Sequence, residues 1–277
     1  METNKEVLKR LIQETLLKEY CNLIEGVDID EETKTVSFNS SHEDNVDTSL
    51  LINPTYNNIN GVDVISIFKR KKANDFSFDG NPLIYALKGL NSWRFKNPQS
   101  DIINLLKQFI RIAEKIKSKY DTIITIPSSN ELNIQFLYRL NKIVKSNFQI
   151  TDYLNKLNIE DVYENFIDWK QLKLDYGDKY DSAKRLLNKF FSNMEKDNNN
   201  YFSYKFIKDV NLRKYITMTI YSDDEKTIEY APHINGKNIL ILDDTIGTGK
   251  TISEACKEIL ETFTPNSITV ITLFSKL

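Results

Sequence analysis

Residues 239–251, ILILDDTIGTGKT, decide the fold that this chain is expected to have. Four branched apolar residues in a row are typical of a strand that is buried on both faces of a parallel sheet. This strand runs into two acids, Asp243 and Asp244, and then into a turn that contains two glycines. Apolar residues recur at helical spacing after the turn, up to about residue 262. The stretch therefore predicts a strand, a glycine-interrupted turn and a helix.

The turn has the properties of a phosphate-binding site. Ligands of open α/β sheets bind beyond the carboxyl ends of strands, and the N-terminus of a helix offers backbone N–H groups and the positive end of a dipole. Glycines let the backbone approach an anion closely, and hydroxyl groups add donors. The residues predicted to bind phosphate are Thr245, Gly247, Thr248, Gly249, Lys250 and Thr251.

The two acids in front of the turn need a different partner. A phosphate would repel Asp243 and Asp244, whereas sugar hydroxyls or a hydrated cation would suit them. Carboxylates that face hydroxyls a few residues from a phosphate describe a phosphorylated sugar. We therefore expect a hollow of anion size at the tip of the helix, with both aspartates open to it. An ordinary strand–turn–helix junction with solvated acids is the alternative.

The end of the stretch, Gly249-Lys250-Thr251, also matches the end of a nucleotide-binding P-loop, G-x-x-x-x-G-K-[ST]. That motif needs a glycine five positions before Gly249, where this chain has Asp244. An acid at that point would face the phosphates of the nucleotide. The sequence therefore disfavours an NTPase loop.

The stretch resembles the motif with which type I phosphoribosyltransferases bind phosphoribosyl pyrophosphate (PRPP). The resemblance implies that Asp243 and Asp244 are the catalytic acids, which hold the ribose 2- and 3-hydroxyls directly or through Mg²⁺. It also implies that residues 247–251 clasp the 5-phosphate, and that PRPP and a nucleobase or nucleotide are the ligands. One departure is Gly247, because the hypoxanthine/guanine enzymes have an acid there that is proposed to act on the purine.

Two further segments extend the resemblance over about residues 82–277. Residues 120–130, YDTIITIPSSN, are similar to the family's pyrophosphate loop, for which an ordinary strand-to-helix turn is the alternative. Residues 82–95 are similar to competence-protein-F-like phosphoribosyltransferases. The residues implied to bind pyrophosphate are Pro127, Ser128, Ser129 and Asn130. Lys276 follows the last predicted strand, as does a base-binding lysine of purine phosphoribosyltransferases, but it could equally be a solvated terminal lysine.

The segment ahead of the motif is rich in aromatic residues. Residues 201–221 contain six aromatic residues and the basic pair Arg213-Lys214. In the family that the motif resembles, a mobile segment in this region closes over the reaction and brings a base. Aromatic residues in the cores of strands, expected at 204–207 and 216–221, are the alternative explanation.

The whole chain reads as an α/β protein in which helices alternate with buried strands. We expect a parallel-sheet phosphoribosyltransferase-like core at residues 81–277, a helical insertion at 150–200 and an N-terminal α+β appendage at 1–80. The other predicted strands are residues 35–38, 49–52, 62–68, 122–126 and 268–274. The other predicted helices are residues 5–24, 82–90, 101–117 and 131–144.

Composition narrows the class of protein. The 277 residues are 40% hydrophobic and 27% charged, which is typical of a globular protein. The net charge of −2 disfavours nucleic acid as a partner. Only two cysteines, no long apolar stretch and no signal peptide lead us to expect a cytoplasmic protein with no membrane contact. A second copy of the chain or a protein partner is expected to bind through residues 1–80.

Two functions are compatible with these features. The first is a Mg²⁺-dependent enzyme that transfers ribose-5-phosphate from PRPP to a nitrogenous base and releases pyrophosphate. The second is a non-catalytic module that senses PRPP or a nucleotide, or that binds a partner. The absent acid at Gly247 and the large helical insertion favour the second function.

Overall fold

The strand of the decisive stretch is β11 (Asn238–Ile246), and it lies inside the main sheet. This arrangement comes from a computed structural model, which describes residues 26–71, 81–116, 118–128, 132–196, 200–204 and 207–275. The predicted helix at 5–24, Cys21, Ser129, Asn130 and Lys276 lie outside the described residues.

The main sheet has seven strands in the order β3-β5-β12-β11-β7-β8, with β4 paired to β5. The other bounds are β3 (Val46–Asp47), β4 (Thr55–Ile59), β5 (Val62–Arg70), β7 (Thr122–Thr125), β8 (Phe148–Ile150) and β12 (Ser267–Ser275). The pairs from β5 through β8 are parallel, and only β3 and β4 join β5 in the antiparallel sense. The predicted α/β class with a parallel sheet is confirmed.

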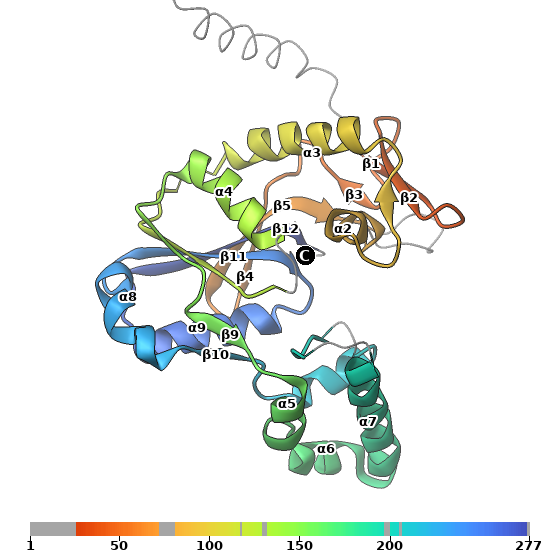
Figure 1. Cartoon of the computed structure of the whole chain (residues 1–277), viewed down its shortest axis with the longest axis vertical. Helices are drawn as coiled ribbons and strands as arrows, with labels where there is room; N and C mark the ends of the chain where they lie inside the picture. Colours follow the sequence, from red (N-terminus) through yellow and green to blue (C-terminus); the bar gives the residue numbers. More distant parts are fainter. Residues whose placement is uncertain are drawn as a thin grey trace, which may run out of the picture.

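Helices cover both faces of this sheet (Figure 1). The first face carries α3 (Pro98–Ala113) and α4 (Leu132–Val144), and the second carries α8 (Thr227–Ile234) and α9 (Lys250–Thr262). Successive residues of a strand point to opposite faces. Leu240 and Leu242 accordingly pack into the core under α3 and α4. Ile239 and Ile241 pack into the core under α9, so the run of four apolar residues is buried on both sides.

A smaller sheet lies at one end of the main one. It contains β1 (Gly26–Asp30), β2 (Thr35–Asn39) and β6 (Arg94–Phe95), next to helix α2 (Asn81–Lys88). The strand β5 lies within the expected appendage, yet it pairs along its length with β12. The main sheet therefore takes strands from both sides of the expected division at residues 80 and 81.

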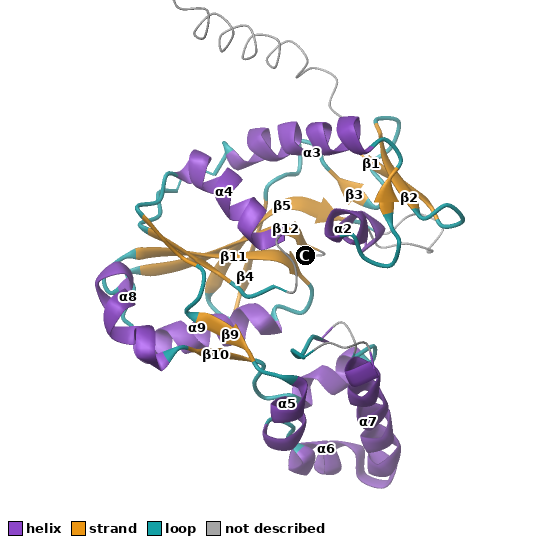
Figure 2. Cartoon of the chain, viewed as in Figure 1, coloured by secondary structure: helices purple, strands orange, loops and turns teal. Residues whose placement is uncertain are grey.

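The expected helical insertion is a helical module, which we define as residues 157–219. It is held between two antiparallel strands, β9 (Leu154–Lys156) and β10 (Ile220–Ser222). Its helices are α5 (Ile159–Asn165), α6 (Trp169–Tyr176), η2 (Gly177–Lys179), α7 (Tyr180–Lys196) and η4 (Val210–Tyr215), and the short η5 (Asp224–Lys226) follows β10. The module has its own hydrophobic core and protrudes from the sheet domain (Figure 2).

Two predicted strands are wrong. Residues 49–52 form a turn, because the Asp47 carboxylate accepts the N–H of Ser49 and the Asn53 amide donates to the carbonyls of Asp47 and Ser49. Such local side-chain bonds compete with a strand ladder. Tyr204 and Ile207 lie outside any strand as well, since they pack into the core of the helical module, and the expected strand at 216–221 is reduced to β10.

Within the described residues, none of the helices combines the length and the apolar character that a membrane crossing requires. The expected cytoplasmic location remains a prediction.

Candidate functional site

The site opens where the main sheet splits. The strand β7 pairs with β11 only as far as Thr125 and Leu242, and the last bond of this ladder joins the N–H of Ile126 to the Leu242 carbonyl at 2.9 Å. On its other side, β11 continues alongside β12 as far as Ile246. Asp243 and Asp244 are therefore the first residues of β11 that no longer pair with β7. A crevice beyond the carboxyl ends of strands is where ligands bind in such sheets.

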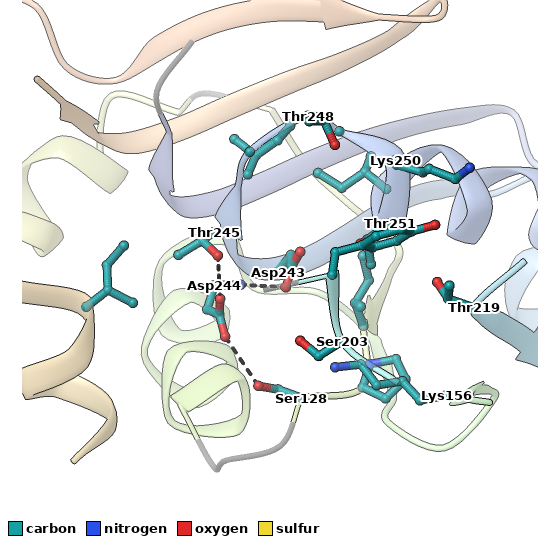
Figure 3. Close-up of a pocket in the computed structure, with 18 of the residues that line it drawn as sticks. Ser128, Lys156, Ser203, Thr219, Asp243, Asp244, Thr245, Thr248, Lys250 and Thr251 are labelled. Carbon is teal, nitrogen blue, oxygen red and sulfur yellow. Dashed lines mark hydrogen bonds between the residues drawn. The ribbon is translucent and has the colours of Figure 1, made fainter. Parts of the chain in front are cut away.

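A cavity of about 550 Å³ fills this crevice. Both aspartates line it, together with residues 245–251 of the turn and the first residues of α9. Pro127 and Ser128, which follow β7, also line it. The structure thus brings the strand end, the glycine turn and the segment after β7 to one cavity (Figure 3).

Asp244 is held by three neighbours. The Lys88 ammonium of α2 lies 2.5 Å from its Oδ2, and the Ser128 hydroxyl donates to the same oxygen at 3.2 Å. The Thr245 hydroxyl donates to Oδ1 at 2.9 Å. Asp244 is only 5% exposed, so the expectation that both acids are open to solvent is wrong for this residue. The ion pair with Lys88 compensates the negative charge of the Asp244 carboxylate, which would otherwise be buried without a partner.

Asp243 is the more open of the two acids. It is half-buried, and its Oδ1 accepts the backbone N–H of Asp244 at 2.8 Å. Burial and the neighbouring charge of Asp244 together raise the pKa of Asp243 to about 7, whereas the hydrogen bond from the Asp244 N–H and the charges of Lys156 and Lys88 act in the opposite direction. A carboxyl group whose pKa lies near neutrality ionises readily when a cation or a donor arrives.

The turn after β11 has the geometry expected of an anion site. Gly249 has a φ of +76° and directly precedes α9, whose first N–H groups point out of the helix end toward the turn. A Cβ at this position would lie 3.0 Å from Ile59 Cδ1, so a side chain here would clash as well as strain the backbone. Apart from its two chain neighbours, none of the described residues has a heavy atom within 4 Å of the place that a Cβ of Gly247 would take. The turn is tight at Gly249 and open to the cavity at Gly247.

Two predicted phosphate ligands are engaged elsewhere in the structure. The Thr245 hydroxyl bonds Asp244, as described above. The Lys250 ammonium donates to the carbonyl oxygens of Arg213 and Ile216 in the helical module. Burial lowers the pKa of Lys250. The remaining predicted residues of the turn also line the cavity. Among the described residues, no hydrogen-bond partner is seen for the hydroxyl groups of Thr248 and Thr251.

The same cavity contains cations that sequence reasoning missed. Five cationic side chains and two carboxylates line it within the described part of the chain. The cationic residues are Arg70 at the end of β5, Lys88 on α2, Lys156 on β9, Arg213 on η4 and Lys250 on α9. The sequence singles out only Lys250 as a ligand, whereas Lys88 and Arg213 lie in segments that are noted for other features. A cavity with this excess of positive charge is suited to a ligand with several negative charges.

The helical module is attached to the first two turns of α9. Besides the Lys250 bonds, the buried Glu254 accepts the N–H and the hydroxyl of Thr219, at 2.8 and 2.5 Å, and the Tyr204 hydroxyl at 2.9 Å. Burial raises the pKa of Glu254 despite these donors. Phe202, Ser203, Tyr204 and Arg213 thereby form one wall of the cavity. Phe202, Tyr204 and Tyr215 of the aromatic segment pack in this wall or in the core of the module.

Comparison with known proteins agrees with the position of the site. Residues 202–277 match the family model of the phosphoribosyl transferase domain. The match begins in the wall formed by the helical module and includes β10, α8, β11, α9 and β12. No curated protein matches the chain. The resemblance to type I phosphoribosyltransferases is confirmed for these residues, which cover the C-terminal quarter of the chain.

Proposed function

We propose, because residues 202–277 match the family model of the phosphoribosyl transferase domain, that this chain binds PRPP with Mg²⁺ and transfers its ribose-5-phosphate to a nitrogenous base. One observation supports the proposal above the others. An acid pair at the end of β11 and a glycine turn at the N-terminus of α9 border the same cationic cavity. A phosphorylated sugar needs both of these features within a few ångströms of each other.

The 5-phosphate would bind the turn from Gly247 to Thr251. The N-terminus of α9 provides backbone donors and a positive dipole end for it. The absence of steric obstruction around Gly247 leaves room for the phosphate oxygens. Thr248 and Thr251 would donate their hydroxyl groups, and Lys250 would act through its charge because its ammonium is bonded to the helical module.

The ribose hydroxyls would bind the acid pair. Asp243 is the better exposed carboxylate and would accept a hydrogen bond directly from a ribose hydroxyl. Asp244 is fixed by Lys88 and Ser128, and it would orient the ring edge and keep negative charge next to Asp243. Pro127 and Ser128 line the same cavity and would contact the pyrophosphate, as would Ser129 and Asn130 outside the described residues.

The acid pair also fits a magnesium ion. Mg²⁺ prefers carboxylate, water and phosphate oxygens, and it is often bound by only one or two protein carboxylates. Within the described residues, no group of three or more acidic, histidine or cysteine side chains could hold a metal alone. Asp243 and Asp244 would therefore share the ion with the ligand. When bound, Mg²⁺ would neutralise the charge that develops on the departing pyrophosphate.

The reaction would need no nucleophile from the protein. The bond between C1 of the ribose and the pyrophosphate oxygen breaks, and its electron pair leaves with pyrophosphate. The lone pair of a ring nitrogen of the base forms the new bond to C1, and where that nitrogen carries a proton, the proton passes to solvent water. The phosphate turn would hold one end of the substrate, and Ser128 with the cations Lys88 and Lys156 would hold the pyrophosphate at the other end. C1 would then lie between the leaving group and the base.

A pyrophosphate-release assay tests this proposal. The protein would be incubated with PRPP, Mg²⁺ and each member of a panel of nucleobases. Release of pyrophosphate that depends on one base supports the transferase. A variant with Thr248→Val and Thr251→Val, which keeps the shape of both side chains, should lower the rate by weakening phosphate binding. Release that is the same with and without every base would contradict the transfer reaction.

The second candidate is a non-catalytic module that senses PRPP or a nucleotide. The observation that favours it is Gly247, which has no side chain to act on a purine at the position where the similar enzymes have an acid. PRPP binding without pyrophosphate release for any base would support this function.

A further inference from the structure

Arg213 is a half-buried cation that faces the cavity with most of its donors unused. It lines the cavity from η4 of the helical module. Its Nε–H donates to the Ile207 carbonyl at 2.9 Å, which leaves the two terminal nitrogens of the guanidinium. Among the described residues, no carboxylate forms an ion pair with it. Burial lowers the pKa of Arg213, as expected of a charge removed from water without a compensating anion.

The wall around Arg213 is aromatic. The Tyr204 and Phe202 rings line the same cavity as Arg213, and they pack edge-on against each other at 5.1 Å between centroids. A planar ligand could therefore pack along an aromatic surface while the guanidinium binds a group at its edge. Arginine is the side chain that recognises carboxylates with two parallel hydrogen bonds.

This wall is fixed in position before any ligand arrives. Lys250 donates to the backbone carbonyls of Arg213 and Ile216, and Glu254, one turn further along α9, accepts the Tyr204 hydroxyl. Both recognition groups are thus tied to the helix that forms the phosphate turn. A binding group that is held by its neighbours loses less entropy when it binds.

From these contacts we propose that the base accepting the ribose-5-phosphate carries an anionic group, a carboxylate on a planar nitrogen heterocycle, and that Arg213 binds this group. The inference rests on the proposed function, because it assigns the acceptor of that reaction. Arg213 would decide between acidic and neutral heterocycles, and Tyr204 would pack against the ring.

Pyrophosphate is the other anion that could reach this cavity, and the wall suits it less. Magnesium pyrophosphate is strongly hydrated and has no apolar face, so burial against aromatic rings would be unfavourable for it. The cations with the largest influence on Asp243 are Lys156 and Lys88. These two lysines are better placed than Arg213 to interact with a leaving group next to the acid pair.

Matched pairs of heterocycles test the proposal. Orotate with uracil, and nicotinate with nicotinamide, differ within each pair by an anionic carboxylate. Calorimetric titration of the full chain with Mg²⁺ and saturating ribose 5-phosphate should show that the acid of at least one pair binds about tenfold to a hundredfold more tightly than its neutral partner. Arg213→Gln should remove this difference, and Arg213→Lys, which keeps the charge without the planar fork, should retain part of it.

Two controls separate this inference from a folding defect and from the proposed function. Arg185→Gln removes an exposed arginine from α7 of the same module and should keep the preference for the acid. Arg213→Gln should bind ribose 5-phosphate as the wild type does, which shows that the phosphate turn is intact. If the wild type fails to bind ribose 5-phosphate, the proposed function fails, and the acid preference is then measured without the sugar.

Three results would overturn the assignment of Arg213. The first is equal binding, or no binding, of the acid and the neutral compound in both pairs. The second is an acid preference that survives in Arg213→Gln. The third is a loss of affinity for inorganic pyrophosphate in Arg213→Gln while the affinity for the acids is unchanged.

Discussion

The Lys88 ammonium lies 2.5 Å from the Asp244 carboxylate, and this ion pair joins α2 to the end of β11 across 156 residues of sequence. Both side chains are largely buried, with 14% and 7% of their surface exposed. The pair holds the helix that precedes α3 against the acid end of the site. It also places a positive charge beside the two neighbouring carboxylates of Asp243 and Asp244.

Lys88→Met should destabilise the protein by about 3 kcal/mol, because it leaves the buried carboxylate of Asp244 without a partner. Urea unfolding followed by circular dichroism measures this change as a lower midpoint. Adding Asp244→Asn to the Lys88→Met variant removes the unpaired charge and should recover much of the loss. Equal midpoints for wild type and Lys88→Met would show that the pair does not form.

Asp243→Asn should stabilise the protein at pH 8 and have little effect at pH 4. In the folded state, burial and the charge of Asp244 raise the pKa of Asp243 to about 7, above the value of 3.8 for a free aspartate. Folding therefore takes up a proton between about pH 4 and 7, and stability falls as the pH rises through that window. Thermal unfolding without Mg²⁺ should give a Tm for the variant a few degrees above that of wild type at pH 8. A difference in Tm that is the same at both pH values would contradict the raised pKa.

Glu254→Ala should loosen the helical module from α9. The substitution leaves the N–H and hydroxyl of Thr219 and the hydroxyl of Tyr204 without their acceptor, at an expected cost of about 2 kcal/mol. The variant should have a lower urea midpoint, and a protease should cleave the chain near residues 200–219 more quickly. Glu261→Ala on the exposed face of the same helix is the control, since its ion pair with Lys257 is solvated and should contribute less than about 0.5 kcal/mol. Cleavage at the same rate in both variants would argue against the attachment through Glu254.

Gly249→Ala should be more harmful than Gly236→Ala. Both glycines have positive φ, at +76° and +67°, so both alanines strain the backbone by about 1 kcal/mol. Only at Gly249 would the new Cβ also press on Ile59, at 3.0 Å. The comparison of the two unfolding midpoints isolates the steric part, and ribose 5-phosphate titration should show weaker binding for Gly249→Ala alone. Equal effects of the two substitutions would mean that the turn adjusts freely.

The central elements of the fold could be predicted because their signals are local. A run of four branched apolar residues, two acids and a glycine turn describe β11 and α9 within thirteen residues, and β7, α4 and β12 have equally clear periodicity. The position of β5 in the main sheet could not be predicted in this way. Its apolar pattern identifies a strand, but its parallel partner β12 lies about two hundred residues later in the chain. Long-range pairing of this kind has no signature within either segment.

The same distinction applies to the site. The acid pair and the phosphate turn were identified from consecutive residues, and the structure brings them to one cavity. Lys88 and Lys156 were missed because each is one lysine among many in the sequence, and only folding brings it to the cavity. Arg213 lies in a segment that stands out for its aromatic residues. Phe202, Tyr204 and Tyr215 of that segment pack in the core or the cavity wall of the helical module, and Tyr221 lies on β10.

Calorimetric titration of PRPP in the presence of Mg²⁺ tests most directly whether the acid pair and the phosphate turn bind a phosphorylated sugar. The wild type should bind, and Asp243→Asn combined with Asp244→Asn should bind at least about a hundredfold more weakly, since both carboxylates that face the hydroxyls and the ion are lost. Asp178→Asn with Asp181→Asn, which removes two exposed acids from the helical module, is the matched control and should bind as the wild type does. PRPP affinity that is unchanged in a folded Asp243→Asn and Asp244→Asn variant would contradict the proposed site.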